Sequence, residues 1–141
     1  MLKAKDIMCR DVIGVKKGTS VLEALKIIAE SNITGLPVIK DDASSSLIGI
    51  VSERDFLNLL YGTHNWESET VDSVMTTNPE CIDEDATVRE VCDLMRSNAF
   101  RRVPVVSKGK LVGVVSRRDI VSFMWNRLEH VGDLEGFLKQ Q

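Results

Sequence analysis

Two short polar segments carry the side chains best suited to hold a ligand, Ser52-Glu53-Arg54-Asp55 and Ser116-Arg117-Arg118-Asp119. Each places a hydroxyl and a carboxylate three residues apart at the start of a predicted helix. The free N–H groups and the positive dipole end at such a start favour a phosphate, and an ionised Asp offers only acceptors, which suits a ribose diol. The same spacing is also typical of a helix cap, with Ser as the N-cap and Asp as the third helical residue.

An arginine pair is the second feature suited to binding. Arg101-Arg102 stands directly before Val103-Pro104. A planar guanidinium group forms paired, charge-assisted hydrogen bonds with phosphate oxygens. The alternative interpretation is a pair of solvated arginines, or a salt bridge to one of the 21 acidic residues.

The residue types that usually carry catalysis or bind metals are sparse. The two histidines, His64 and His130, lie in a polar stretch and a charged tail, and no known catalytic motif is present, so we predict no catalytic residue. The three cysteines, Cys9, Cys81 and Cys92, are widely spaced, with no CxxC pattern and no histidine nearby, which predicts free thiols and no metal site. We expect neither an enzyme nor a protein that requires a cofactor.

Composition places the chain among ordinary folded proteins. Its 141 residues, 43% of them hydrophobic, are enough for one compact domain or two very small ones around a shared core. The formal net charge of −3 gives no reason to expect nucleic acid as the main partner. No apolar run is long enough for membrane insertion, and charged residues interrupt the N-terminus, which lacks a signal peptide. We therefore expect a cytoplasmic protein.

The chain also contains an internal repeat. At an offset of 67 residues, Met8 falls on Met75 and Pro37 on Pro104. After a longer turn in the first copy the offset drops to 64, and 47–52 then matches 111–116. Both Ser-Asp segments are therefore kept, but the place of the arginine pair is taken by Thr34-Gly35 in the first copy, which has no basic residue there.

Each copy predicts the order helix, strand, strand, helix, with a short strand ahead of the first helix. Apolar residues at helical spacing predict the helices, and a proline opens a hairpin of two short apolar strands. The predicted elements are strands near 12–15 and 81–82, helices over 21–29 and 88–95, hairpins over 37–51 and 104–115, and helices that begin near Glu53 and Arg117.

The predicted fold class is α+β, with two pseudo-symmetric repeats, each a small sheet flanked by helices. One repeat alone is too small to bury a full core, so two should pack together. The predicted divisions are a first repeat at 1–62, a connector at 63–71, a second repeat at 72–124 and a C-terminal helical extension at 125–141. Gly132 and Gly136 should weaken the helix in that extension.

The order of these motifs resembles the cystathionine β-synthase (CBS) domain, and their duplication resembles a CBS pair, or Bateman module. The resemblance rests on an apolar-Pro-Val run, a turn, an apolar-Gly-apolar-Val-Ser run and Arg-Asp, over roughly Ala4 to Phe123. It implies regulatory binding of adenine nucleotides such as AMP, ADP or ATP in clefts between the repeats. It also implies a homodimer and an effector protein that the module regulates.

The resemblance implies roles for individual residues. Ser52, Asp55, Ser116 and Asp119 would contact phosphate and ribose, and Arg101 and Arg102 would face the phosphates of one site. An adenine ring needs flat apolar contacts as well. Candidates for these contacts are Val12, Ile13, Leu36 and Pro37 in the first copy, and Cys81, Ile82, Val103 and Pro104 in the second. Each of these apolar residues could equally belong to the core.

A second hypothesis is a ligand-independent interaction module that docks on a partner enzyme or transporter. Its basis is the apolar and charged tail after Trp125, since large aromatic side chains are enriched at interfaces. Core packing is the alternative role for both Trp66 and Trp125. The nucleotide, the number of occupied sites and the regulated protein stay open at this stage.

Overall fold

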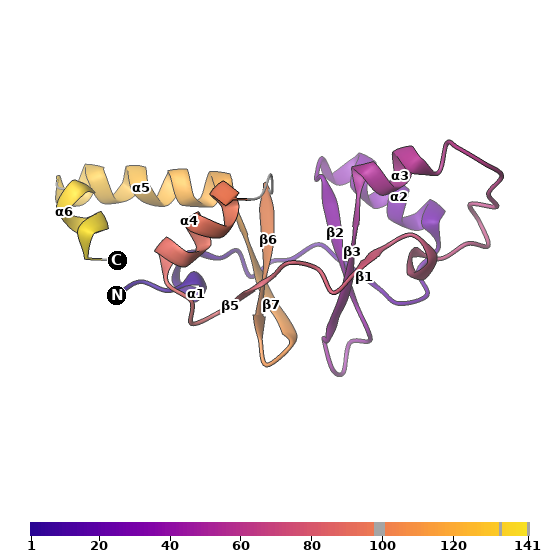
Figure 1. Cartoon of the computed structure of the whole chain (residues 1–141), viewed down its shortest axis with the longest axis horizontal. Helices are drawn as coiled ribbons and strands as arrows, with labels where there is room; N and C mark the ends of the chain where they lie inside the picture. The colour runs from indigo at the N-terminus through magenta and orange to yellow at the C-terminus, as the bar shows by residue number, and fades with distance from the viewer. Residues whose placement is uncertain (98–100, 133, 141) are drawn as a thin grey trace. The chain divides into compact units, whose positions relative to one another are not determined.

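The computed structural model describes residues 1–97, 101–132 and 134–140, and they form two compact units (Figure 1). Unit 1 consists of Met1–Val12 and Glu80–Gln141, and unit 2 consists of Ile13–Pro79. Each unit is a small mixed sheet with helices packed on it. The predicted α+β class with two repeats is confirmed.

Unit 2 is built on a four-stranded sheet in the order β1-β2-β3-β4. Its elements are β1 (Val15–Lys16), α2 (Val21–Ser31), β2 (Gly35–Ile39), β3 (Leu47–Ser52), α3 (Glu53–Asn58), the 3-10 turn η1 (Val71–Ser73) and β4 (Thr76–Thr77). Strand β1 runs parallel to β2, and the other neighbours are antiparallel. The core joins Ala24 and Ile28 of α2 and Phe56 of α3 to Leu36 and Val38 of the sheet.

Unit 1 repeats this plan on a three-stranded sheet in the order β5-β6-β7. Its elements are α1 (Ala4–Ile7), β5 (Ile82–Asp83), α4 (Val88–Ser97), β6 (Arg102–Ser107), β7 (Lys110–Ser116), α5 (Arg117–Val131) and α6 (Leu134–Lys139). Strand β5 is parallel to β6, and β6 is antiparallel to β7. Val91 and Met95 of α4, Ile120 of α5 and Val103 and Val105 of β6 share one core.

Local sequence signals set where these elements begin and end. Ser20 caps α2, because its hydroxyl accepts the Glu23 N–H at 3.1 Å. The β6–β7 hairpin turns through Lys108 and Gly109, both at positive φ, which matches the twist of the flanking strands. At the other end of the chain, α5 stops at Gly132, whose φ of 75° is left-handed, so the tail is two helices.

The two units exchange the opening segments of the sequence repeats. Cys9, from the start of the chain, pairs with Val114 of β7 through N–H···O bonds of 2.8 and 2.9 Å. At the equivalent place in unit 2, Thr76 pairs with Ile50 of β3. Each unit therefore combines the hairpin of one repeat with the opening segment of the other, and the compact units divide the chain differently from the repeats predicted at 1–62 and 72–124.

In each unit, a methionine of the exchanged segment packs directly against a glycine of the hairpin. A Cβ added to Gly113 would lie 2.5 Å from Met8 Sδ, and one added to Gly49 would lie 2.6 Å from Met75 Sδ. Only a residue without a side chain allows the thioether to approach the strand this closely. The pairing of Met with Gly thus recurs at equivalent positions of both units.

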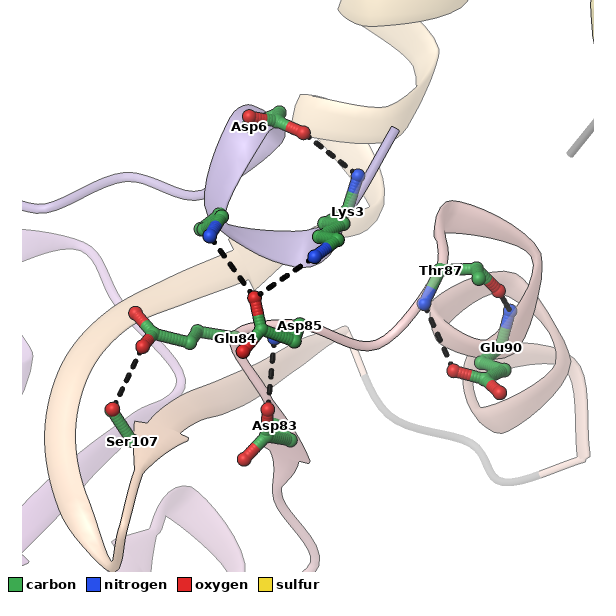
Figure 2. A network of polar contacts seen from close by, with 9 residues as sticks. Lys3, Asp6, Asp83, Glu84, Asp85, Thr87, Glu90 and Ser107 are labelled. Atoms are coloured by element: carbon green, nitrogen blue, oxygen red, sulfur yellow. Dashed lines mark hydrogen bonds and ion pairs between the residues drawn. The ribbon is translucent and has the colours of Figure 1, made fainter. Parts of the chain in front are cut away.

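Helix α1 is further held to the loop before α4, as Figure 2 shows. The Ala4 N–H donates to the Ala86 carbonyl at 2.7 Å, and Asp85 Oδ1 lies 3.3 Å from Lys3 Nζ and 3.0 Å from Lys5 Nζ. Hydrogen bonding to Lys5 and Lys3 lowers the pKa of Asp85, and the same contact raises the pKa of Lys5. The start of the chain is therefore an integral part of unit 1.

The predicted connector and extension also take part in the two units. Within residues 63–71, Trp66 packs against the core of unit 2 and Val71 is fully buried. Helix α5 runs without a break across the predicted boundary at residue 125. Among the helices in the described part of the chain, none combines the length and the apolar character needed to cross a membrane.

Candidate functional site

The predicted binding residues of unit 1 meet at one end of the β6–β7 hairpin. Arg102 of β6 is directly opposite Ser116 of β7, and the Arg117 N–H donates to the Arg101 carbonyl at 3.0 Å. The antiparallel register thus brings the arginine pair next to the first turn of α5, although 14 residues separate Arg102 from Ser116 in sequence. The repeat pattern alone could not establish this juxtaposition, which depends on the register of the hairpin.

Both Ser-Asp pairs form the helix cap that the sequence offered as the alternative. In unit 1 the Ser116 N–H donates to Asp119 Oδ2 at 2.8 Å, and Ser116 Oγ accepts the Asp119 N–H at 3.0 Å. In unit 2 the Ser52 N–H donates to Asp55 Oδ2 at 2.7 Å. Among the described residues, Oδ1 of Asp119 accepts no hydrogen bond, so the cap uses only one of the two carboxylate oxygens. Capping and ribose binding are therefore compatible.

Four exposed arginines surround the start of α5. They are Arg101, Arg102, Arg117 and Arg118. Within the part of the chain that the structure describes, no ion pair joins any of them to a carboxylate. The salt-bridge interpretation of the arginine pair is therefore not supported among these residues. Unpaired guanidinium groups beside a helix N-terminus form a strongly positive surface that suits a phosphate.

The corresponding end of the hairpin in unit 2 has a different charge. Gly35 is opposite Ser52, and the Glu53 N–H donates to the Thr34 carbonyl at 3.0 Å, so the backbone arrangement is the same. The four equivalent positions hold Thr34, Gly35, Glu53 and Arg54 in place of four arginines. The two sites are chemically unequal, as predicted, and the contrast is larger than the arginine pair alone indicated.

Arg117 is the functional candidate that sequence reasoning missed. It stands where the first repeat has Glu53, so the comparison of the repeats at the offset of 64 already contained the signal. The Ser and Asp on either side are the same in both repeats, and the residue after the Ser reverses its charge.

The predicted apolar contacts divide into core and surface residues. Leu36, Pro37, Val103 and Pro104 are buried, and Leu36 and Val103 belong to the two cores. Ile13 and Cys81 are exposed. Ile13 lies two residues before β1, which runs parallel to β2, and Cys81 directly precedes β5, which runs parallel to β6. A Cβ added to Gly14 would lie 2.9 Å from the Pro37 carbonyl, so the segment of Ile13 lies against that proline. Val12 and Ile82 are half-buried, so Ile13 and Cys81 are the exposed members of the predicted set.

The cysteine and histidine residues provide no candidate for catalysis or metal binding among the described residues. Partial desolvation and the carboxylates of Glu80 and Asp83 raise the pKa of the Cys81 thiol, which disfavours the nucleophilic thiolate. His64 lies in the loop after α3 and His130 near the end of α5, both away from the β6–β7 hairpin end in sequence. Within the described residues, no group of three or more His, Cys, Asp or Glu side chains is arranged to hold a metal ion.

Comparison with protein families gives one match. The CBS domain model matches residues 4–62 and again 71–126. In sequence, the chain is 34% identical over 120 residues to the uncharacterized protein YlbB of Bacillus subtilis. The alignment covers 85% of this chain and 80% of YlbB.

Two solved structures with bound ligands are similar to this chain. One is CBSX2 of Arabidopsis thaliana in complex with AMP, at 29% identity and a TM-score of 0.77, covering 89% of this chain and 98% of CBSX2. The other is the CBS domain pair of protein MJ0100 in complex with 5′-methylthioadenosine and S-adenosyl-L-methionine. It has 29% identity and a TM-score of 0.73, and covers 90% of this chain and 98% of the MJ0100 chain.

Proposed function

Because this chain belongs to the CBS domain family, we propose that it is a regulatory, non-catalytic module that binds an adenine nucleotide beside Arg102 and Asp119. The observation that supports this proposal most strongly is the β6–β7 register, which places Arg101 and Arg102 next to the first turn of α5. The structures of CBSX2 with AMP and of MJ0100 with two adenosine derivatives support this class of ligand. No cofactor is required in this proposal, since the nucleotide is the regulatory signal.

Each part of the ligand has a chemical counterpart in unit 1. Phosphate oxygens accept hydrogen bonds from the guanidinium groups of Arg101 and Arg102, with Arg117 adding positive charge at the helix start. The ribose hydroxyls donate to Asp119 Oδ1, the carboxylate oxygen that the cap leaves available, and Ser116 stands at the phosphate side. Among the apolar candidates, exposed Cys81 supplies a contact for the base, whereas Val103 and Pro104 are buried in the hairpin that carries the site.

The second site, on unit 2, is proposed to bind phosphate more weakly. Ser52 and Asp55 keep the acceptor geometry, and Ile13, Leu36 and Pro37 are its apolar candidates. Glu53 places a negative charge where unit 1 has Arg117. Like charges repel, so a nucleotide with a phosphate group should occupy unit 1 first.

In this proposal the protein works as a cytoplasmic homodimer that passes its ligand state to an effector protein. A ligand shifts a conformational equilibrium only by its difference in affinity between the two states. The proposed site joins two strands to a helix start and carries exposed arginines. A phosphate that orders these arginines can provide this difference in affinity.

A ligand-independent interaction module is the competing function. The exposed apolar residues of α5, Val121, Trp125 and Leu128, favour it, because three such side chains at helical spacing form a surface that a partner could cover. In that case nucleotides would leave stability unchanged, whereas Trp125→Glu would abolish capture of the partner.

Thermal unfolding in the presence of different ligands separates these functions. A ligand that binds only the folded state raises the unfolding temperature, with about 2.7 kcal/mol of stabilisation at a concentration 100 times Kd. We expect AMP, ADP or ATP to raise the unfolding temperature of the wild type. S-adenosylmethionine, which lacks a phosphate, should raise it less.

Asp119→Ala and Asp55→Ala form a matched pair for this experiment, since each removes one helix cap. Asp119→Ala should abolish the shift caused by AMP, whereas Asp55→Ala should retain most of it. No shift with any adenine nucleotide at millimolar concentration would exclude the proposal.

A further inference from the structure

The loop between α3 and η1, residues 61–70, closes over the start of α2. The Val21 N–H donates to the Glu69 carbonyl at 2.8 Å, and the Leu22 N–H donates to the Trp66 carbonyl at 3.1 Å. These N–H groups belong to the first turn of α2, whose donors have no partner within the helix. The position of the loop therefore decides whether the first turn of α2 is satisfied.

His64 ties the two ends of this loop together. Its Nδ1 lies 3.1 Å from Glu69 Oε1, and its Nε2 lies 3.2 Å from the Tyr61 carbonyl oxygen. The side chains of His64 and Glu69 are 26% and 31% exposed, so both are largely shielded from solvent. The imidazole ring thus bridges the first residue of the loop and one of its last.

The number of protons decides whether both of these contacts are hydrogen bonds. A carbonyl oxygen and an ionised carboxylate can only accept, and a neutral imidazole has a single N–H. Both bonds form only when the His64–Glu69 pair holds one additional proton, either on the ring or on the carboxyl group. Loss of that proton leaves two acceptors facing each other at one end of the ring.

Glu69 makes the loop more sensitive to this proton. Its second oxygen, Oε2, is buried and has no hydrogen-bond partner among the described residues. A buried carboxylate oxygen without a partner is costly, and a neighbouring positive charge offsets that cost. When His64 becomes neutral, the carboxylate loses its counter-charge while Oε2 stays buried.

No other charged side chain in the described structure pairs with the ring. The elements that the loop joins or covers carry the following charged residues: Lys17 before α2, Glu23, Lys26 and Glu30 of α2, Glu53, Arg54 and Asp55 of α3, Glu67 of the loop and Asp72 of η1. Hydrogen bonding to Glu69 is the largest effect on His64, and it raises the pKa of the imidazole above its ordinary value of 6.5. The proton therefore leaves at a higher pH than it would from an ordinary imidazole.

We propose that residues 61–70 form a pH-sensitive clasp, closed on α2 while the His64–Glu69 pair holds its proton and loosened when that proton leaves. Opening removes the Glu69 and Trp66 carbonyls from the first turn of α2 and withdraws Trp66 from the core of unit 2. The clasp acts on unit 2 and does not depend on whether a nucleotide binds.

Hydrogen exchange of single amides reads the clasp directly. After correction for the intrinsic effect of pH, the protection of the Val21 and Leu22 amides should fall several-fold as pH rises through the titration of His64. His64→Gln should remove this dependence. His130→Gln is the matched control, because the hydrogen bond that His130 makes among the described residues lies within α5, and this variant should behave as the wild type.

Titration of the His64 ring, followed by NMR, is a second measurement. It can be made on the wild type, so it tests the proposal even if a variant folds poorly. The pKa of His64 in the folded wild type should exceed its value in the urea-unfolded chain, and Glu69→Gln should lower it. A folded pKa at or below the unfolded one, or amide protection that does not change across this range, would overturn the proposal.

Discussion

At the scale of single residues, Asp119 caps helix α5, and in the proposed function it would also accept the ribose hydroxyls. Its Oδ2 holds the start of α5 through the Ser116 N–H, while Oδ1 accepts nothing from the described residues. Asp55 accepts the Ser52 N–H in the same way, so this contact does not distinguish the two sites. The arginines around Asp119 make that distinction, since they supply the positive charge that a phosphate requires.

Residue types and spacing alone led to the Ser-Asp pairs and to Arg101-Arg102. The Ser-Asp pairs could be found because a cap and its helix lie within four consecutive residues. The contact of Arg102 with Ser116 depends on strand register, which short-range patterns specify only loosely. Similarly, nothing near Gly113 in sequence indicates that Met8 lies on it.

Gly113→Ala tests the fastening of the opening segment on unit 1. The added Cβ would lie 2.5 Å from Met8 Sδ and 3.0 Å from the Cys9 carbonyl oxygen, so the segment must move. We expect a loss of about 1–3 kcal/mol in the free energy of unfolding, measured by urea titration. In a Met8→Ala background the same substitution should cost less. An unchanged stability of Gly113→Ala would contradict the observed contact.

At the scale of secondary structure, the elements with strong local signals were predicted well. Helix α2 has a Ser cap and a regular apolar face. The hairpins were predicted to begin at their prolines, but their first strands begin two residues earlier, at Gly35 and Arg102, so the prolines lie within the ladder opposite Ile50 and Val114. Helix α5 begins at Arg117 and breaks at Gly132, as expected. These features depend on neighbours in sequence.

Helix α1 and strand β4 were not predicted, because contacts with the other repeat stabilise them. Helix α1 has only four residues and is held by the Ala86 carbonyl and Asp85. Strand β4 has two residues and pairs only with β3. Elements this short are not stable in isolation, so their sequences carry little local signal.

Val71→Ala tests whether the second exchanged segment carries part of the core of unit 2. Val71 is fully buried and lies in the same cluster as Leu36 and Phe56. Deleting its two methyl groups should lower the free energy of unfolding by roughly 2 kcal/mol, a magnitude typical of buried aliphatic truncations. Leu22→Ala, at an exposed position, should change it by less than about 0.5 kcal/mol. Equal effects of the two substitutions would show that the segment is not part of the core.

At the scale of the whole molecule, the charges of the exchanged segments match the residues that they contact. In unit 1, Lys5 lies against Asp85, and in unit 2 the equivalent contact joins Asp72 to the Gly18 N–H at 3.0 Å. In the opposite combination, Asp72 would take the place of Lys5 and face Asp85. Like charges directly opposite each other are unfavourable, so the sequence disfavours the arrangement without exchange.

The expected dimer is also a property of the whole molecule. The two repeats expose apolar residues at equivalent positions, Leu57 and Tyr61 in the first and Val121 and Trp125 in the second. We expect the wild type to sediment as a dimer and the double variant Leu57→Glu/Trp125→Glu to sediment as a folded monomer. Leu22→Glu, at another exposed apolar position, serves as the control. A wild type that stays monomeric at high concentration, or a variant that stays dimeric, would exclude these contacts.

Calorimetric titration of AMP tests the central claim most directly, since it measures binding to the full chain without relying on unfolding. The wild type should bind AMP, and Arg101→Gln/Arg102→Gln should lose most of that affinity, because both arginines are exposed and make no ion pair among the described residues. Arg96→Gln/Lys108→Gln removes two exposed positive charges elsewhere in unit 1 and should bind as the wild type does. Undiminished binding by the Arg101→Gln/Arg102→Gln variant, or the absence of binding by the wild type, would contradict the account.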